Sequence, residues 1–567
     1  MAVIFNGAAR AFCLALLAST SIARAADVSY DRLKNPEPRN WLTNHGDYGA
    51  HRYSALDRVN RGNVGGLKMA FSVAIGGDGA KENLVATPVV DDGFMYMPDA
   101  WGNVYKIDVR SGKAGRVVWK MNPGQQKIDR NRGVALWGNL VISVTSGDAR
   151  VVATDRDTGK VVWDKKLDDQ RDLTLNAAPL AIEKTVMIGA SGGDQGVRDW
   201  VAALDAKTGA EIWRRYSVPA PGEPGSETWK DKNNAWQTGG GAFYATGSYD
   251  PASNIAYWGA GNPTPKYDSS YRPGDNLFTD SALALDADNG KILWFHQYTP
   301  NDTMDYDEIG SHVLLDGKFG GADRKLVVHA GRNGFEYAFD RANGQFLKAT
   351  QYVPEATWTK GIDAKTGRPV DYDPAKDIQT YAAPVSQVVS GARATVCPAV
   401  PGGSNFWPPS YSEQAKILFV PEVEGCSFVL RDQTRHVPGK FEGGSFGYDS
   451  RVTSGVVALD PLTGEIRNRV KMDYPNTSGA LTTAGGLVFT ALLDGTVMAL
   501  DDKTLETLWS VNVGTGVNAP PMTYEVDGKQ YVAIATGLTG NQVGRLSRTP
   551  ELQDMAKYNT MLFVFGL

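Results

Sequence analysis

Four acidic residues stand close together in one segment of this chain, TPNDTMDYDEIG. Asp302, Asp305, Asp307 and Glu308 fall within seven residues there. Carboxylates supply general bases and oxygen ligands for hard metal ions, although an acidic loop is more often simply solvated. The segment is therefore a candidate site only if other unusual segments lie beside it.

Other segments combine glycine with polar or aromatic side chains. Glycine-rich turns allow the backbone to approach a flat ligand closely. The chemically useful residues are Asp194 in GASGGDQGVRDW, Gly239, Gly240, Gly241 and Tyr244 in WQTGGGAFYATGSYD, Asn262 in YWGAGNPTP and Arg332 in HAGRNGF. Each signal is weak alone, so its meaning depends on the elements that position it.

A repeated pattern indicates what those elements are. It reads apolar-x-apolar-Asp-x-x-(Thr/Asn/Ser)-Gly, often followed by Trp, and its aspartates are Asp108, Asp155, Asp205, Asp286, Asp340, Asp460 and Asp501. The pattern predicts a strand, a tight turn and a second strand. Units of about 45 residues with several short strands are typical of β-propeller blades. Trp163, Trp213 and Trp294 are then expected to staple neighbouring sheets together and to take no part in chemistry.

The spacing of the repeats bears on the number of blades. Most copies follow one another at similar intervals, but the gaps from Asp205 to Asp286 and from Asp340 to Asp460 are wider. These gaps leave room for a degenerate blade and for long loops, so seven or eight blades fit. We expect an all-β fold, a single eight-bladed β-propeller over residues 26–567, with its function on loops at one end of the central channel.

The segment 1–25 is expected to be a secretory signal peptide. Arg10 precedes the apolar run 11–17, and Ala23-Arg24-Ala25 has the A-x-A form of a cleavage site. This run falls short of the roughly 20 apolar residues that cross a bilayer, and no later segment is long enough. We therefore expect a soluble, exported protein without a transmembrane segment.

The charge, histidine and cysteine content limits the kinds of partner, metal site and haem that this chain can bind. With 58 basic and 63 acidic residues, the net charge of −5 argues against binding of nucleic acid. The six histidines lack a metal-binding spacing such as H-E-x-x-H, and no C-x-x-C-H motif for covalent haem occurs. In an oxidising compartment, Cys397 and Cys426 are expected to form a disulfide; two free thiols are the alternative.

Several motifs along the chain carry a specific family resemblance. Over essentially the whole chain after the leader, the sequence resembles the quinoprotein alcohol dehydrogenases, the methanol/ethanol dehydrogenase family that uses pyrroloquinoline quinone (PQQ). The motifs that carry the resemblance are NWLTNHGDYGAHRYSALDRVN, NRGVALWG, SGGDQGVRDW, WQTGGG, GAGNPTP, RPGDNLFTDSALALD, TPNDTMDYDEIG, GRNGFEYAFDRANG, SNFWPPSYS and LTTAGGLVFTALLDG. The resemblance implies an eight-bladed propeller with PQQ over its channel.

The resemblance also implies residues for the cofactor, which carries three carboxylates and an ortho-quinone. Arg132 matches an arginine that holds a PQQ carboxylate, and Arg332 matches one that bonds the quinone oxygens. The remaining expected cofactor contacts are Ser191, Gly192 and Gly193 as donors, Asn405 as a donor, Asn176 in place of a threonine, and Tyr244 in place of a stacking tryptophan.

Four residues match the family's metal site and catalytic base. Asp194, Asn262 and Asp305 match metal ligands, and Asp305 also matches the general base that takes the alcohol proton. Asp307 matches the additional aspartate of lanthanide-dependent relatives. Asp307 adds a third carboxylate to those of Asp194 and Asp305, and three carboxylates suit a trivalent ion. Asp194, however, stands where the family has glutamate, whose side chain is one methylene longer. Both Ca²⁺ and a lanthanide ion therefore remain open.

Several positions depart from the family pattern. Gln126-Lys127 replaces a vicinal cysteine pair that covers one face of PQQ, Ala242 replaces a threonine, and Thr477 replaces an active-site tryptophan. The Thr477 exchange is expected to enlarge the pocket. Cys397 and Cys426 match a structural disulfide of the family.

These observations predict a periplasmic PQQ-dependent dehydrogenase. We expect it to oxidise a bulky or secondary alcohol to an aldehyde or ketone and to pass electrons to a soluble cytochrome c, because the chain has no haem motif of its own. The alternative is a non-catalytic β-propeller scaffold, which would not need Arg132, Asp305 and Arg332 together.

Overall fold

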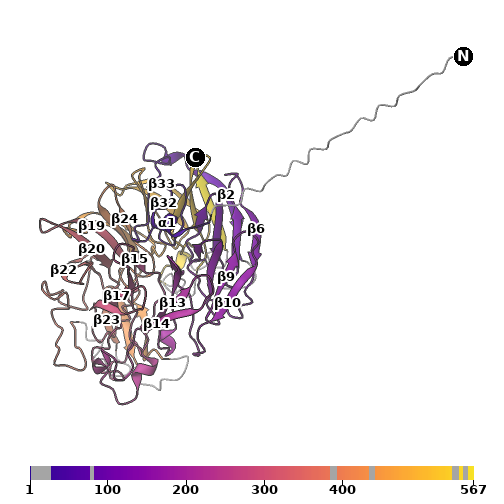
Figure 1. The fold of residues 1–567 in the computed structure, drawn as a ribbon. Coiled ribbons are helices and arrows are strands. Elements are labelled where there is room, and N and C mark those ends of the chain that lie inside the picture. The colour runs from indigo at the N-terminus through magenta and orange to yellow at the C-terminus, as the bar shows by residue number, and fades with distance from the viewer. Residues whose placement is uncertain are drawn as a thin grey trace.

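The structure is a computed structural model. Apart from Met1, it describes residues 27–76, 82, 84–382, 393–432, 441–538, 548–552 and 560–567. The expected signal peptide at 1–25 lies outside these residues. The described part is all-β apart from short helices, as expected (Figure 1). The helical segments are α1 (Tyr30–Lys34), η1 (Val64–Gly66), η2 (Gly193–Gln195), η3 (Ser226–Thr228), η4 (Ala235–Thr238) and η6 (Pro550–Leu552).

Antiparallel sheets follow one another along the chain. The described residues form eight sheets of four or five strands and a ninth of three strands. The first four sheets are β3 (Val89–Asp91), β4 (Phe94–Pro98), β5 (Val104–Asp108) and β6 (Arg116–Met121); β7 (Ala135–Trp137), β8 (Leu140–Thr145), β9 (Arg150–Asp155) and β10 (Val161–Lys166); β11 (Leu180–Ile182), β12 (Thr185–Gly189), β13 (Trp200–Asp205) and β14 (Glu211–Tyr216); and β15 (Ser248–Asp250), β16 (Ile255–Gly259), β17 (Ser281–Asp286) and β18 (Ile292–Gln297).

The later sheets have the same form. They are β19 (His312–Phe319), β20 (Ala322–Ala330), β21 (Phe335–Asp340) and β22 (Phe346–Gln351); β24 (Ser410–Ser412), β25 (Ile417–Glu424), β28 (Thr453–Leu459) and β29 (Ile466–Met472); β30 (Leu481–Thr483), β31 (Leu487–Ala491), β32 (Thr496–Asp501) and β33 (Thr507–Asn512), with β1 (Tyr53–Ser54) added in parallel; and β34 (Met522–Val526), β35 (Lys529–Ala535), β36 (Met561–Gly566) and β2 (Lys68–Ala74).

The aspartate of the repeat ends the third strand of its sheet and builds the turn to the fourth. At β9, Asp155 Oδ1 accepts hydrogen bonds from the backbone N–H of Thr158 at 2.8 Å and from its hydroxyl at 2.7 Å. Gly159 then takes φ of +73°, the left-handed conformation that favours glycine. Local side-chain bonding thus explains why the repeat was readable in the sequence.

The repeated tryptophans join neighbouring sheets, which confirms the predicted stapling role. Trp163 Nε1 donates to the carbonyl of Ala206 at 3.3 Å, and Trp213 Nε1 donates to that of Ala287 at 2.9 Å; each acceptor belongs to the turn of the next sheet. Trp294 does the same to Arg341 at 3.2 Å. All three side chains are thus occupied by packing between sheets.

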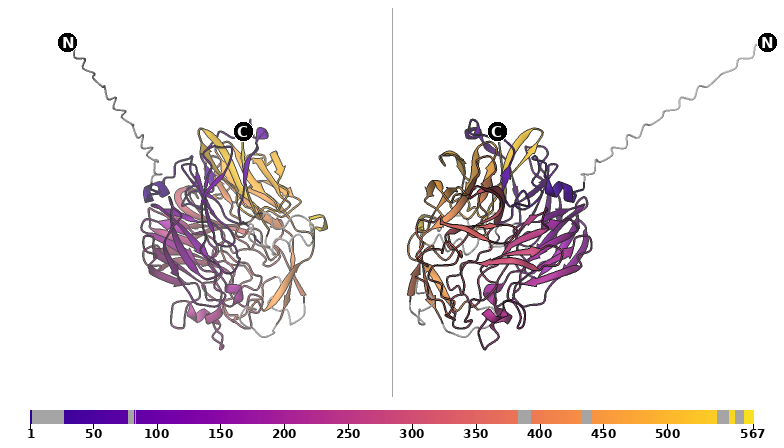
Figure 2. Two further views of the ribbon diagram at one scale, coloured as in Figure 1. Left: turned by 90° about the vertical axis from the view of Figure 1, so that its right-hand side faces the viewer. Right: turned by 60° about the vertical axis from the view of Figure 1, so that its left-hand side comes forward.

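Both ends of the chain contribute to one sheet. The early strand β2 pairs antiparallel with β36 at the C-terminus, and the two lie side by side in both views of Figure 2. This sheet lacks the aspartate repeat, because its fourth strand, β2, comes from earlier in the chain and no turn joins it to β36. Joining the ends in this way satisfies strand edges that would otherwise stay open.

The two wide gaps leave room for a degenerate blade, but among the described residues they hold no additional four-stranded sheet. Asp205 and Asp286 end β13 and β17, the third strands of consecutive sheets. In the later pair, Asp340 ends the third strand β21 and Asp460 directly follows the third strand β28. The gaps hold long loops, also expected, and the three-stranded sheet β23 (Arg393–Val396), β26 (Ser427–Arg431) and β27 (Gly444–Tyr448). The irregular sheet is instead the one at the chain ends.

The predicted disulfide is confirmed. Cys397 and Cys426 are bonded, directly beyond the paired residues Val396 and Ser427 of β23 and β26. The bond therefore fixes one end of the three-stranded sheet. No helix among the described residues is long and apolar enough to cross a membrane.

Candidate functional site

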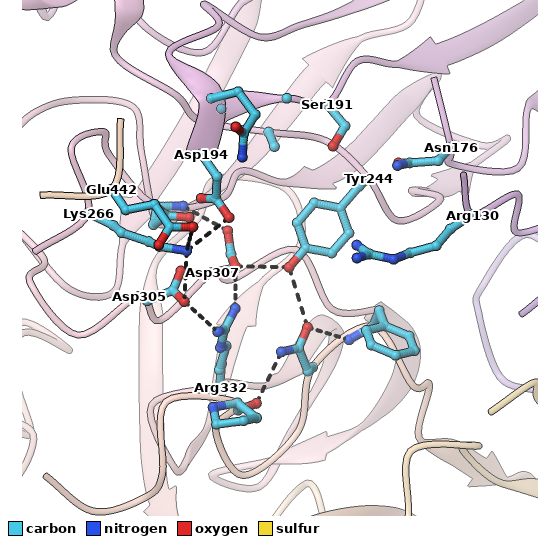
Figure 3. A pocket seen from close by; sticks show the side chains of 18 of the residues that line it. Arg130, Asn176, Ser191, Asp194, Tyr244, Lys266, Asp305, Asp307, Arg332 and Glu442 are labelled. Carbon is cyan, nitrogen blue, oxygen red and sulfur yellow. Dashed lines mark hydrogen bonds and ion pairs between the residues drawn. The ribbon is translucent and has the colours of Figure 1, made fainter. Parts of the chain in front are cut away.

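One cavity of about 770 Å³ brings together all twelve residues expected to take part in catalysis or to bind the cofactor or the metal ion. They are Arg132, Asn176, Ser191, Gly192, Gly193, Asp194, Tyr244, Asn262, Asp305, Asp307, Arg332 and Asn405. Figure 3 shows many of these side chains converging on one space. Segments far apart in the chain, such as those of Arg132 and Asn405, thus meet at a single site.

The strand order explains this convergence. In a four-stranded antiparallel sheet, the connection from the second to the third strand and the connection from the fourth strand to the next sheet lie at the same end. Asp194, Asn262 and Arg332 follow the second strands β12, β16 and β20. Arg132 and Tyr244 follow the fourth strands β6 and β14. All of these loops therefore open at one end of the molecule.

Asp305 is buried between two cations. Its Oδ2 lies 3.3 Å from Arg332 Nη2 and 3.5 Å from Lys266 Nζ, and the Tyr267 hydroxyl approaches it at 3.5 Å. Burial raises the pKa of Asp305 to about 8, although Lys266 and Arg332 act in the opposite direction. A carboxyl with such a pKa is suited to accept a proton near neutral pH.

Asp307 is also buried, and its contacts tie three parts of the site together. Its Oδ1 accepts the backbone N–H of Asn262 at 3.0 Å, and its Oδ2 accepts the Tyr244 hydroxyl at 2.9 Å. Arg332 Nη1 forms an ion pair with the same Oδ2. Asp307 therefore holds Arg332, Tyr244 and the Asn262 loop at fixed positions (Figure 3).

The other two acids of the same segment support the loop and do not face the cavity. Asp302 accepts the backbone N–H groups of Met304 at 3.0 Å and Tyr306 at 3.1 Å. Glu308 accepts the backbone N–H of Arg332 at 2.8 Å and pairs with His329. Of the acidic run, only Asp305 and Asp307 line the cavity.

Asp194 is held by a residue that sequence reasoning missed. Lys266 Nζ donates to Asp194 Oδ2 at 3.0 Å and lies 3.5 Å from Glu442 Oε1 at the rim. Burial opposes ionisation, but the Lys266 ammonium holds the pKa of Asp194 below its usual value. The signal was available in the sequence, because Lys266 directly follows the motif YWGAGNPTP that contains Asn262.

The cationic side of the cavity fits an anionic ligand. Arg132 is buried, its Nε has no partner among the described residues, and burial lowers its pKa to about 10. Its guanidinium lies over the rings of Tyr244 at 5.0 Å and Phe406 at 5.1 Å. Arg130 and Arg548, also missed from the sequence, line the same cavity. A buried arginine with an open donor suits an anion such as a carboxylate.

Two polar side chains of the cavity, Asn176 and Asn405, use only part of their hydrogen-bonding capacity within the protein. Asn176 keeps an unpartnered Oδ1 among the described atoms. Asn405 Nδ2 donates to the carbonyl of Pro401 at 3.0 Å, which leaves the second N–H of this amide for a ligand. The open N–H of Asn405, with Arg132 and the ring of Tyr244, suits a flat tricarboxylate, and the carboxylates of Asp194, Asp305 and Asp307 suit a hard cation.

The glycines of WQTGGG serve protein packing and not ligand approach. A Cβ on Gly240 would lie 2.6 Å from Thr264 Oγ1, and one on Gly193 would lie 2.9 Å from the Cα of Gly240. The two glycine-rich loops therefore pack against each other. Thr477 likewise does not line the cavity. It is buried and donates to Asn518 Oδ1 at 2.9 Å, so Asn518 forms the wall there.

Comparisons with known proteins identify the family of this chain. The family described as "Glucose/ethanol/alcohol dehydrogenase, beta-propeller domain" matches residues 41–426 and 444–532. The quinoprotein alcohol dehydrogenase PedH of Pseudomonas putida is 35% identical over 546 residues, which cover 91% of this chain and 89% of the relative.

Two solved structures are similar over almost the whole chain. The quinohemoprotein alcohol dehydrogenase ADHIIG from Pseudomonas putida HK5 superposes with a TM-score of 0.87 at 31% identity, covering 96% of this chain and 82% of that one. A europium-containing methanol dehydrogenase gives a TM-score of 0.86 at 29% identity, covering 95% of this chain and 100% of that one.

Proposed function

Because this chain belongs to the PQQ-dependent quinoprotein alcohol dehydrogenases, we propose that it is a periplasmic enzyme that oxidises a bulky or secondary alcohol to an aldehyde or ketone. Its eight four- and five-stranded sheets are the eight blades of the propeller, and residues 1–25 are its signal peptide. The electrons pass to a soluble cytochrome c. A non-catalytic scaffold would not need the buried charges of this cavity.

The cofactor groups supply the electron chemistry. When bound, PQQ would supply a two-electron acceptor for the hydride of the alcohol carbon, and Ca²⁺ or a lanthanide ion would supply Lewis acidity toward the quinone. Arg132 holds a carboxylate of PQQ, with Ser191, Gly192, Gly193, Asn176 and Asn405 as further contacts. Asp194, Asn262, Asp305 and Asp307 supply oxygen ligands for the ion.

Asp305 is the general base of the reaction. Its carboxylate takes the hydroxyl proton of the alcohol while two electrons leave with the hydride, which leaves a carbonyl group on the substrate. Arg332, 3.3 Å from Asp305 Oδ2, keeps the base oriented and provides positive charge where negative charge develops. The buried position of Asp305 between Arg332 and Lys266 is the observation that carries this proposal.

Reconstitution tests the activity. Full-length exported protein is loaded with PQQ and either Ca²⁺ or La³⁺, and reduction of a dye is followed after addition of alcohol. Asp305→Asn should lower the rate about 10²- to 10⁴-fold while the quinone absorbance is retained. If the wild-type protein retains no quinone and reduces no dye, the enzyme assignment is refuted.

The metal and the substrate need separate measurements. Asp307→Ala should abolish La³⁺-supported activity but retain Ca²⁺-supported activity if the ion is a lanthanide. Equal losses with both ions would contradict that choice. A panel that compares methanol with bulky secondary alcohols tests the substrate class, and a preference for methanol would contradict it.

A further inference from the structure

Lys266 places a positive charge between the acids of the proposed metal site. Its Nζ lies 3.0 Å from Asp194 Oδ2 and 3.5 Å from Asp305 Oδ2, and the side chain is only 6% exposed. Figure 3 shows the ammonium at the centre of these carboxylates. Asp194 and Asp305 are also the residues expected to bind the metal ion.

The Lys266 ammonium and a metal ion compete for these oxygens. Ca²⁺ needs carboxylate oxygens at about 2.3 to 2.6 Å around one point, whereas Lys266 already draws the two carboxylates toward its own Nζ. Two cations held by the same pair of carboxylates would also repel each other. Metal binding therefore favours movement of Lys266 away from these carboxylates.

Glu442 offers the ammonium another partner. Its Oε1 lies 3.5 Å from Lys266 Nζ, and its side chain is 44% exposed at the rim of the cavity. The Glu442 backbone is anchored, because its carbonyl accepts the N–H of Tyr267 at 2.9 Å. The flexible stem of Lys266 can turn toward Glu442 and keep its charge paired.

We propose that Lys266 is a resident counter-cation of the metal site, which occupies the site between Asp194 and Asp305 in the metal-free protein and moves to Glu442 when a metal ion enters. This proposal rests on the proposed function, because it concerns the same metal site. It predicts that Lys266 weakens metal binding and that Glu442 assists it.

Terbium binding tests the exchange directly. Tb³⁺ is titrated into the full-length protein without PQQ, and its luminescence is sensitised by the nearby rings of Tyr244 and Tyr267. Lys266→Met should lower the dissociation constant at least tenfold, because no ammonium competes. Lys266→Arg should keep the weak binding of the wild type. Lys503→Met, on an exposed turn, is the control for loss of a lysine.

A double-mutant cycle tests the role of Glu442. Glu442→Gln should raise the dissociation constant several-fold in the wild-type background and leave it unchanged in the Lys266→Met background. Circular dichroism checks that each variant is folded. Unchanged or weaker Tb³⁺ binding by Lys266→Met, or no Tb³⁺ binding by either protein, would overturn the proposal. Dye reduction measured in parallel shows whether the enzymatic function itself stands.

Discussion

Gly290 lies where the turn of one sheet packs against the tryptophan of the preceding sheet, and substituting it measures that contact. A Cβ at Gly290 would lie 2.4 Å from Cε3 of Trp213. The backbone there has φ of +69°, so alanine would also be strained. We predict that Gly290→Ala lowers the free energy of unfolding through both effects.

The chain offers a matched control for the backbone effect. Gly528 has φ of +71°, and a Cβ there would meet nothing within 4 Å. Gly528→Ala should therefore cost only the left-handed strain, about 1 to 2 kcal/mol. Gly290→Ala should cost the same plus overpacking against Trp213, about 1 to 3 kcal/mol more. Replacing glycine by alanine also lowers the conformational entropy of the unfolded chain, and this effect stabilises both variants by the same amount.

Urea unfolding followed by circular dichroism gives the comparison. The Trp213→Ala background supplies a second check, because without the indole Gly290→Ala should cost no more than Gly528→Ala. Trp213→Phe should lose only the hydrogen bond to Ala287, about 1 kcal/mol, together with some contact area. If Gly290→Ala and Gly528→Ala lower the free energy of unfolding equally, the stapling argument is wrong.

Three further predictions concern the disulfide, pH and the cofactor. Replacing Cys397 and Cys426 by serine should lower the free energy of unfolding by about 4 kcal/mol, the chain-entropy value for a sequence separation of 29, and leave PQQ absorbance unchanged. Burial opposes protonation of His51, but Asp47 raises its pKa to about 9. Protonation of His51 therefore stabilises the fold fully below about pH 6.5, and this stabilisation, about 3 kcal/mol, is lost as the pH rises through 9. Unfolding at pH 6 and pH 10 should show this loss in the wild type but not in His51→Gln; equal pH dependence would contradict it. Arg132→Gln should raise the PQQ dissociation constant about 10- to 100-fold, measured by quinone absorbance, and an unchanged constant would exclude Arg132 as a carboxylate partner.

Local signals were sufficient for much of the fold and of the site. The aspartate and glycine of each repeat form hydrogen bonds within a few residues, as at Asp155 and Thr158, so the sequence alone predicts the turns and the strands around them. The site segments were visible because they interrupt this repeat. The family motifs then assigned Asp305, Arg332 and the other residues that the cavity brings together.

Long-range contacts determine those features of the fold and of the site that local sequence signals do not predict. The sheet at the chain ends depends on pairing of β2 with β36, which come from opposite ends of the chain, and it carries no repeat. Asp302 and Asp305 look equivalent in the sequence, yet one caps its own loop and the other faces the cavity.

The position of Lys266 shows most directly the difference between what the sequence determines and what only the tertiary structure determines. The sequence by itself determined which residue types are available: acids for a hard cation, arginines for an anionic cofactor, and repeats for the sheets that carry them. Only the tertiary structure brought the Lys266 ammonium between Asp194 and Asp305, which belong to two other loops of the chain. The physical reason is that charges interact through space, so which cation meets which carboxylate depends on how the loops of different sheets converge.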